Sequence, residues 1–200
     1  MAREAVFRLL KQGEGTSARP TAEDLQDAAA LGQEAGARRL ERRRRLRALA
    51  AETLGVHPDA VRIERRADGT LRITEPEPLY ASVAGRGAWT ALALGPRPVG
   101  VDVETCPSDT EPPFDLLQPL EQDAILADPD PPRLFLRFWA AREAYLKADG
   151  RGLGVMPDRV RAAQRDEAVA LIEQGRPIAI ARLVEREDAI AAIVELEAEA

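Results

Sequence analysis

Apolar and polar positions along the 200-residue chain follow helical spacing in some segments and strict alternation in others, which predicts a mixture of helices and strands. Residues 21–36 predict a helix with Thr21 as its N-cap, and residues 37–54 predict another that ends at Gly55. Residues 133–149 give the strongest helical pattern, and residues 114–127 predict a shorter helix.

Alternating segments predict the strands. The sequences "VRIERR" and "TLRITE" flank "ADG", which indicates a hairpin, and "LYASVA" and "AWTALAL" are separated by "GRG". Further strands are expected at "VGVDVET", "PIAIARLVE" and "AIAAIVELE", with a turn near Asp188. The last of these stretches also fits a helix, so both alternatives stay open.

The sequence "GPRP" (95–98) is the best internal boundary. It divides the chain into an N-terminal half, 1–97, and a C-terminal half, 98–200, and each half contains a helix followed by a strand hairpin. We therefore expect an α+β fold with a pseudo-duplicated architecture.

Composition narrows the possible functions. No apolar run approaches the ~20 residues of a membrane span, and the first residues show no signal-peptide pattern. Cys106 is the only cysteine, so no disulfide forms within the chain, and we expect a cytoplasmic protein. A single His and a single Cys argue against a structural zinc site or a Ser-His-Asp triad. Any metal would need oxygen ligands, which favour Mg²⁺, Mn²⁺ or Ca²⁺.

Charge is distributed unevenly. The net charge of −6 argues against general nucleic-acid binding, yet seven arginines lie between Arg38 and Arg47. This run is either the solvated face of a helix or a phosphate-binding surface. It has no interleaved aromatic residues, so we expect no nucleic-acid partner. The chain has 26 Arg but only two Lys, which makes Lys147 worth attention.

Two segments carry candidate chemistry. In "VGVDVET", Asp102 and Glu104 project to the same side of a strand, where they form either an ordinary polar face or a pair of ligands for one divalent cation. In the helix 133–149, Glu143 and Lys147 are neighbours at i and i+4. By themselves they would form an exposed ion pair worth roughly 0.3–0.5 kcal/mol. Together with an upstream basic helix, these groups suit a Mg²⁺-bound pyrophosphate.

The segments "GVDVE" and "FWAAREAYLKADGRGL" resemble, in order and spacing, the signature of the 4'-phosphopantetheinyl transferases. The length resembles the surfactin-synthetase type, in which one chain holds two similar halves, each with an antiparallel sheet packed on a long helix. The resemblance implies transfer of the phosphopantetheine arm of coenzyme A to a serine of an apo carrier protein, with release of 3',5'-ADP. It also implies a monomer with no membrane partner.

By position, the resemblance implies that Asp102, Glu104 and Glu143 hold Mg²⁺, with Mn²⁺ as an alternative. Glu143 would also act catalytically by taking the proton of the carrier serine, and Lys147 would stabilise charge on the phosphates. Coenzyme A would further contact residues that match the family's binding positions: Arg38, Ser82 and Arg142. The register of the arginine within residues 38–47 is open.

Three positions depart from the family pattern. Val83 replaces a His, Thr70 replaces a Lys, and Arg142 replaces a Lys while keeping its charge. The first two departures remove phosphate contacts. They leave an alternative open, in which the chain is a degenerate, non-catalytic member that binds a carrier protein or a CoA-like nucleotide. Fatty-acid, polyketide and non-ribosomal peptide carriers all fit the sequence.

Overall fold

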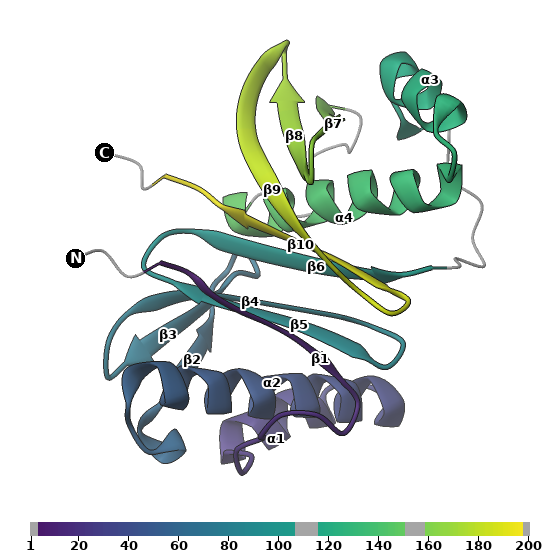
Figure 1. Ribbon diagram of the computed structural model, residues 1–200. Coiled ribbons are helices and arrows are strands. Elements are labelled where there is room, and N and C mark those ends of the chain that lie inside the picture. Colours follow the sequence, from purple (N-terminus) through teal and green to yellow (C-terminus); the bar gives the residue numbers. More distant parts are fainter. Residues whose placement is uncertain (1–3, 107–115, 151–158, 198–200) are drawn as a thin grey trace.

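A computed structural model describes residues 4–106, 116–150 and 159–197. Figure 1 shows an α+β fold in which two antiparallel sheets lie face to face with helices outside them. Among the described residues, no helix combines the length and apolar character needed to cross a membrane. The expected loop at 106–113 and the "GRGLG" segment lie largely outside the described residues.

Each sheet takes its strands from one half of the chain. The first has the order β1-β5-β4-β3-β2 and the second β6-β10-β9-β8-β7. The first sheet is built from β1 (Val6–Lys11), β2 (Arg62–Arg65), β3 (Leu71–Glu75), β4 (Leu79–Arg86) and β5 (Trp89–Gly95). The second is built from β6 (Val99–Thr105), β7 (Val160–Arg165), β8 (Ala168–Glu173), β9 (Arg176–Arg186) and β10 (Ala189–Glu195).

Helices cover the outer faces of the sheets (Figure 1). The helices are α1 (Ala22–Ala29), α2 (Gln33–Leu54), the 3-10 turn η1 (Pro58–Ala60), α3 (Pro119–Ala127) and α4 (Pro131–Asp149). One apolar cluster joins α2 to the first sheet, and another joins α4 to the second. A third cluster, which includes Val101, Val103 and Ala191, fills the space between the two sheets. Burial of apolar side chains at these three interfaces holds the helix and sheet layers together.

The strand predictions agree with the structure, and the ambiguous stretch "AIAAIVELE" is strand β10. The predicted boundary between the first two helices was wrong. Thr21 does cap α1 through a capping box, but α1 ends at Ala29, and α2 begins at Gln33 instead of residue 37. Gly36 lies inside α2, where a Cβ would come within 2.5 Å of the Ala28 carbonyl oxygen. The missing side chain allows α2 to pack against the end of α1.

The arginine run does not form a simple solvated face. Arg43 and Arg47 are each 3% exposed, and both contact Asp24 of α1, which is 2% exposed. The Arg47 Nη2 to Asp24 Oδ2 distance is 2.6 Å. Buried charges require partners, so these arginines fix α1 to α2.

Candidate functional site

Strand β6 and helix α4 approach each other unusually closely. A Cβ at Gly100 would lie 1.9 Å from the carbonyl oxygen of Ala144 and 2.6 Å from the amide nitrogen of Ala148. Only glycine leaves room for this contact, because any side chain would overlap the helix backbone. The close approach brings the polar side of β6 against the C-terminal half of α4.

Asp102 and Lys147 meet at this contact. Alternation along β6 sends Val101 and Val103 into the core between the sheets and turns Asp102 toward α4. Lys147 Nζ lies 2.6 Å from Asp102 Oδ1. Lys147 thus binds a carboxylate of the neighbouring strand rather than forming the exposed pair with Glu143 that the helix alone suggests.

The environment of Asp102 disfavours a lone negative charge. Its side chain is 10% exposed, and Oδ2 is buried without a hydrogen-bond partner in the described part of the chain. Burial raises the pKa of Asp102, while the charge of Lys147 opposes that rise. An unsatisfied buried carboxylate oxygen is a ready ligand for a cation.

Asp102 lies near enough to Glu104 and Glu143 for its charge to raise the pKa of both. Burial raises the pKa of Glu104, and the charge of Asp102 raises it further. The charge of Arg86, whose Nε lies 3.2 Å from Glu104 Oε2, opposes the shift. Burial also raises the pKa of Glu143, followed by the charge of Asp102. The three carboxylates predicted to share a metal thus repel one another in one region of the molecule.

The chemistry of these residues suits a divalent cation. The donor set is carboxylate oxygen, which Mg²⁺ and Mn²⁺ prefer. The unpartnered Asp102 oxygen and the mutual repulsion of the carboxylates also fit a cation. In residues 4–106, 116–150 and 159–197, no three His, Cys, Asp or Glu side chains already lie close enough together to hold a metal. Glu104 and Glu143 would therefore have to turn toward Asp102 to complete the set.

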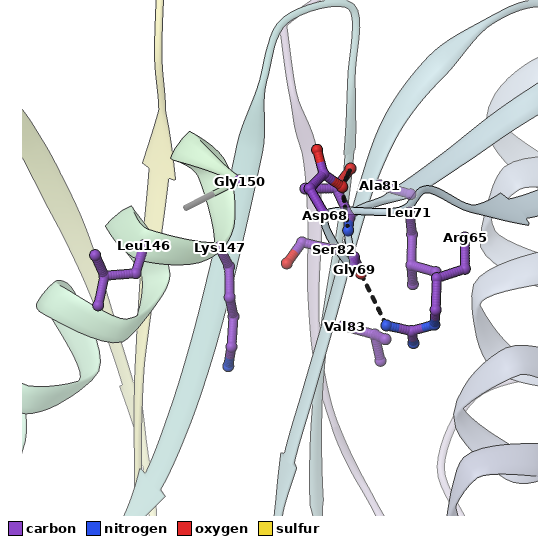
Figure 2. A pocket seen from close by; sticks show the side chains of 11 residues that line it. Arg65, Asp68, Gly69, Leu71, Ala81, Ser82, Val83, Leu146, Lys147 and Gly150 are labelled. Carbon is purple, nitrogen blue, oxygen red and sulfur yellow. Dashed lines mark hydrogen bonds between the residues drawn. The ribbon is translucent and has the colours of Figure 1, made fainter. Parts of the chain in front are cut away.

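A pocket of about 230 Å³ opens beside Lys147, between the end of α4, the β2–β3 turn and β4. Figure 2 shows Lys147 on one side of it, with Arg65 and Val83 on the other and Ser82 between them. Gly150 brings the end of α4 close to the turn, since a Cβ there would lie 3.2 Å from Asp68 Oδ2. The pocket therefore lies between the two halves of the chain.

Two of the predicted site residues, Ser82 and Lys147, line this pocket. Ser82 lines it, but its Oγ accepts a hydrogen bond from the Val101 amide at 3.1 Å, so the hydroxyl also ties β4 to β6. The two departures from the family pattern, Thr70 and Val83, line the same pocket. Arg38 instead lines a neighbouring pocket and forms an ion pair with Glu34.

Arg142, which the resemblance places at a coenzyme A contact, lies buried against α3 and β7. Arg142 is 1% exposed, its guanidinium pairs with Glu121 of α3, and its Nε donates to the Val160 carbonyl at 2.9 Å. It lines none of the pockets around Lys147. The periodicity of α4 explains this position, because residue 142 faces away from residues 143 and 147 toward α3 and β7.

Two pocket arginines were not singled out from the sequence. Arg65 in β2 lines the pocket of Lys147, and Arg42 in α2 lines the adjoining pocket. Arg65 belongs to a predicted hairpin in which nothing marked it as a ligand residue, and Arg42 was one of seven arginines in a run. Only the packing of α2 on the first sheet separates Arg42 from its buried neighbours.

Comparison with known proteins gives two matches. Residues 98–194 match the model of the 4'-phosphopantetheinyl transferase superfamily. A curated protein of Bacillus subtilis named 4'-phosphopantetheinyl transferase is 24% identical over 131 residues, which cover 64% of this chain and 58% of that protein. The match thus spans less than two thirds of that relative's length. The family match includes β6 and α4.

Proposed function

We propose that this chain, whose residues 98–194 match the model of the 4'-phosphopantetheinyl transferase superfamily, transfers the 4'-phosphopantetheine arm of coenzyme A to a serine of an apo carrier protein. The proposal includes the two-half, single-chain type, with halves 1–97 and 98–200. One observation carries it. Lys147 and a buried Asp102 with an unpartnered oxygen meet beside an open pocket lined by both halves of the chain.

The carboxylates and the lysine of the site would have different roles. Asp102, Glu104 and Glu143 would hold Mg²⁺, which neutralises charge on the pyrophosphate oxygens when it is bound. Lys147 lines the pocket, and its ammonium would leave Asp102 to contact a phosphate oxygen of an anionic donor bound there. This exchange needs only a rotation of the flexible lysine side chain.

The transfer step balances without a further reactant. The carrier serine oxygen attacks the phosphorus that bears the pantetheine arm, and the bond from that phosphorus to the bridging oxygen breaks. 3',5'-ADP leaves with the bridging oxygen, and Glu143 takes the serine proton. In the metal-free protein, burial raises the pKa of Glu143, and the charge of Asp102 raises it further.

A second candidate rests on Thr70 and Val83, which leave two uncharged side chains in the pocket. In this alternative the chain binds a carrier protein or a CoA-like nucleotide without transfer. Binding of CoA with no modified carrier would support it.

Incubation with CoA, Mg²⁺ and a panel of apo fatty-acid, polyketide and peptidyl carrier proteins tests the proposal, with intact mass as the readout. We expect at least one carrier to gain the arm. Asp102→Ala and Glu143→Ala should abolish transfer while the far-UV circular dichroism stays unchanged. Glu167→Ala, an exposed change in the β7–β8 turn, should leave transfer at the wild-type rate. Near-normal transfer by either active-site variant refutes the assigned roles.

A further inference from the structure

Strand β4 of the first sheet lies against strand β6 of the second, and the two strands make polar contacts at two successive places (Figure 1). Ser82 Oγ accepts a hydrogen bond from the Val101 amide at 3.1 Å. Four residues further along β4, Arg86 Nε lies 3.2 Å from Oε2 of Glu104, which is three residues further along β6. The first half of the chain therefore places a guanidinium on a carboxylate that the proposed function assigns to a metal.

Two of the three carboxylates assigned to the metal have a cation of the chain as partner. Asp102 pairs with Lys147 of α4, and Glu104 pairs with Arg86 of β4. The side chain of Arg86 is 52% exposed and that of Glu104 only 15%, so the guanidinium can move into solvent more readily than the carboxylate can. Burial raises the pKa of Asp102, and the charge of Arg86 is among the causes that oppose this rise.

The pair with Arg86 and the binding of a divalent cation make opposite demands on Glu104. Within the described residues, no three carboxylates lie close enough together to hold a metal, so Glu104 has to turn toward Asp102. Its pair with Arg86 opposes that turn, and a guanidinium that stays nearby repels the ion. We propose that Arg86 is an intramolecular competitor of the metal, which holds Glu104 in the metal-free chain and leaves it when the ion binds. The proposal rests on the metal role that the proposed function gives to Glu104.

Arg86 is a positioning residue in this account, because it acts through the carboxylate of Glu104. In the metal-free chain its charge offsets part of the repulsion among the three carboxylates. Loss of the guanidinium frees Glu104 to turn and removes a like charge from the neighbourhood of the ion, so the affinity for the metal should rise. If Arg86 instead held Glu104 in its metal-binding position, the same loss would lower the affinity.

Calorimetry with Mn²⁺ as the probe tests the proposal on the full chain at neutral pH, without nucleotide or carrier. Arg86→Gln should bind Mn²⁺ about three- to tenfold more tightly than the wild type, as expected for a partly exposed charge beside a divalent ion. Arg86→Ala should give a similar rise, and it decides the question if Arg86→Gln does not fold. Arg86→Lys keeps a positive charge and should stay close to the wild type.

Arg97→Gln is the matched control. Arg97 pairs with Glu195 of β10, and its side chain is 46% exposed, close to the exposure of Arg86, but neither partner belongs to the proposed metal set. This variant should leave the Mn²⁺ affinity unchanged. In a Glu104→Gln background, Arg86→Gln should raise the affinity less than it does in the wild-type background, because the carboxylate for which the two cations compete is gone.

An unchanged or lower Mn²⁺ affinity in the neutral Arg86 variants overturns the proposal, as does an equal rise in Arg97→Gln. Absence of Mn²⁺ binding in the wild type and in these variants overturns it together with the metal role of Glu104. Failure of transfer gives a different result. If the affinity rises as expected while no carrier is modified, the competitor role stands and transfer does not. If carriers are modified while the affinity is unchanged, transfer stands and the competitor role does not.

Discussion

Replacing Gly100 with alanine would place a methyl group inside the backbone of α4. Its Cβ would lie 1.9 Å from the Ala144 carbonyl oxygen, whereas such contacts need about 3.0 Å, so β6 and α4 would separate by about 1 Å. Overpacking of a core typically costs about 1–3 kcal/mol, and a collision with backbone falls at the upper end or beyond. For a chain of this size, about 3 kcal/mol lowers Tm by about 6–12 °C.

Thermal unfolding followed by circular dichroism measures this effect. Gly32→Ala is the control, because a Cβ at Gly32 meets nothing within 4 Å and its φ of −59° suits alanine. Its cost should stay below about 1 kcal/mol, the usual range for an N-cap. A Tm for Gly100→Ala within 2 °C of the control, on the order of a 1 kcal/mol difference or less, would refute the claim that glycine sets the distance between β6 and α4.

The remaining predictions concern buried and inter-half charges. Arg142→Met should lower the free energy of unfolding by about 3–5 kcal/mol, because Glu121 would keep a buried charge without its partner. Urea denaturation should show this loss, and exposed Arg176→Met should not. Hydrogen bonds from Arg186 and then from the Lys11 amide lower the pKa of Glu14 to about 2. Its contribution to stability is therefore present above pH 4.5 and is lost as the pH falls toward 2. Glu14→Gln should reduce stability at pH 7 and flatten the decline over that range, and an unchanged decline contradicts this assignment.

The sequence predicted the parts of the fold that depend on local periodicity. The strand hairpins, the Thr21 cap and the end of α2 at Gly55 follow from spacing and cap chemistry, and the structure confirms them. Alternation also predicted that Asp102 and Val103 would face opposite sides of β6. The break between α1 and α2 was missed because Gly36 looked like a helix end, whereas it serves a helix–helix contact.

Contacts between distant segments could not be read from the sequence. Lys147 prefers a carboxylate 45 residues away over its helical neighbour Glu143, because the close approach at Gly100 brings β6 to α4. The same limit applies to Arg142, whose motif position suggested a ligand contact although its helix face turns to Glu121. Arg42 and Arg65 are brought together only by the packing of α2 on the first sheet.

The most direct test of the central claim is the mass balance of one reaction. Wild-type protein is incubated with CoA, Mg²⁺ and an apo carrier that serves as acceptor, and both loaded carrier and 3',5'-ADP are quantified by chromatography and intact mass. We expect the two products to appear in equal amounts and both to disappear in Asp102→Ala. Unmodified carrier throughout the panel, together with no detectable binding of CoA by calorimetry, would contradict it.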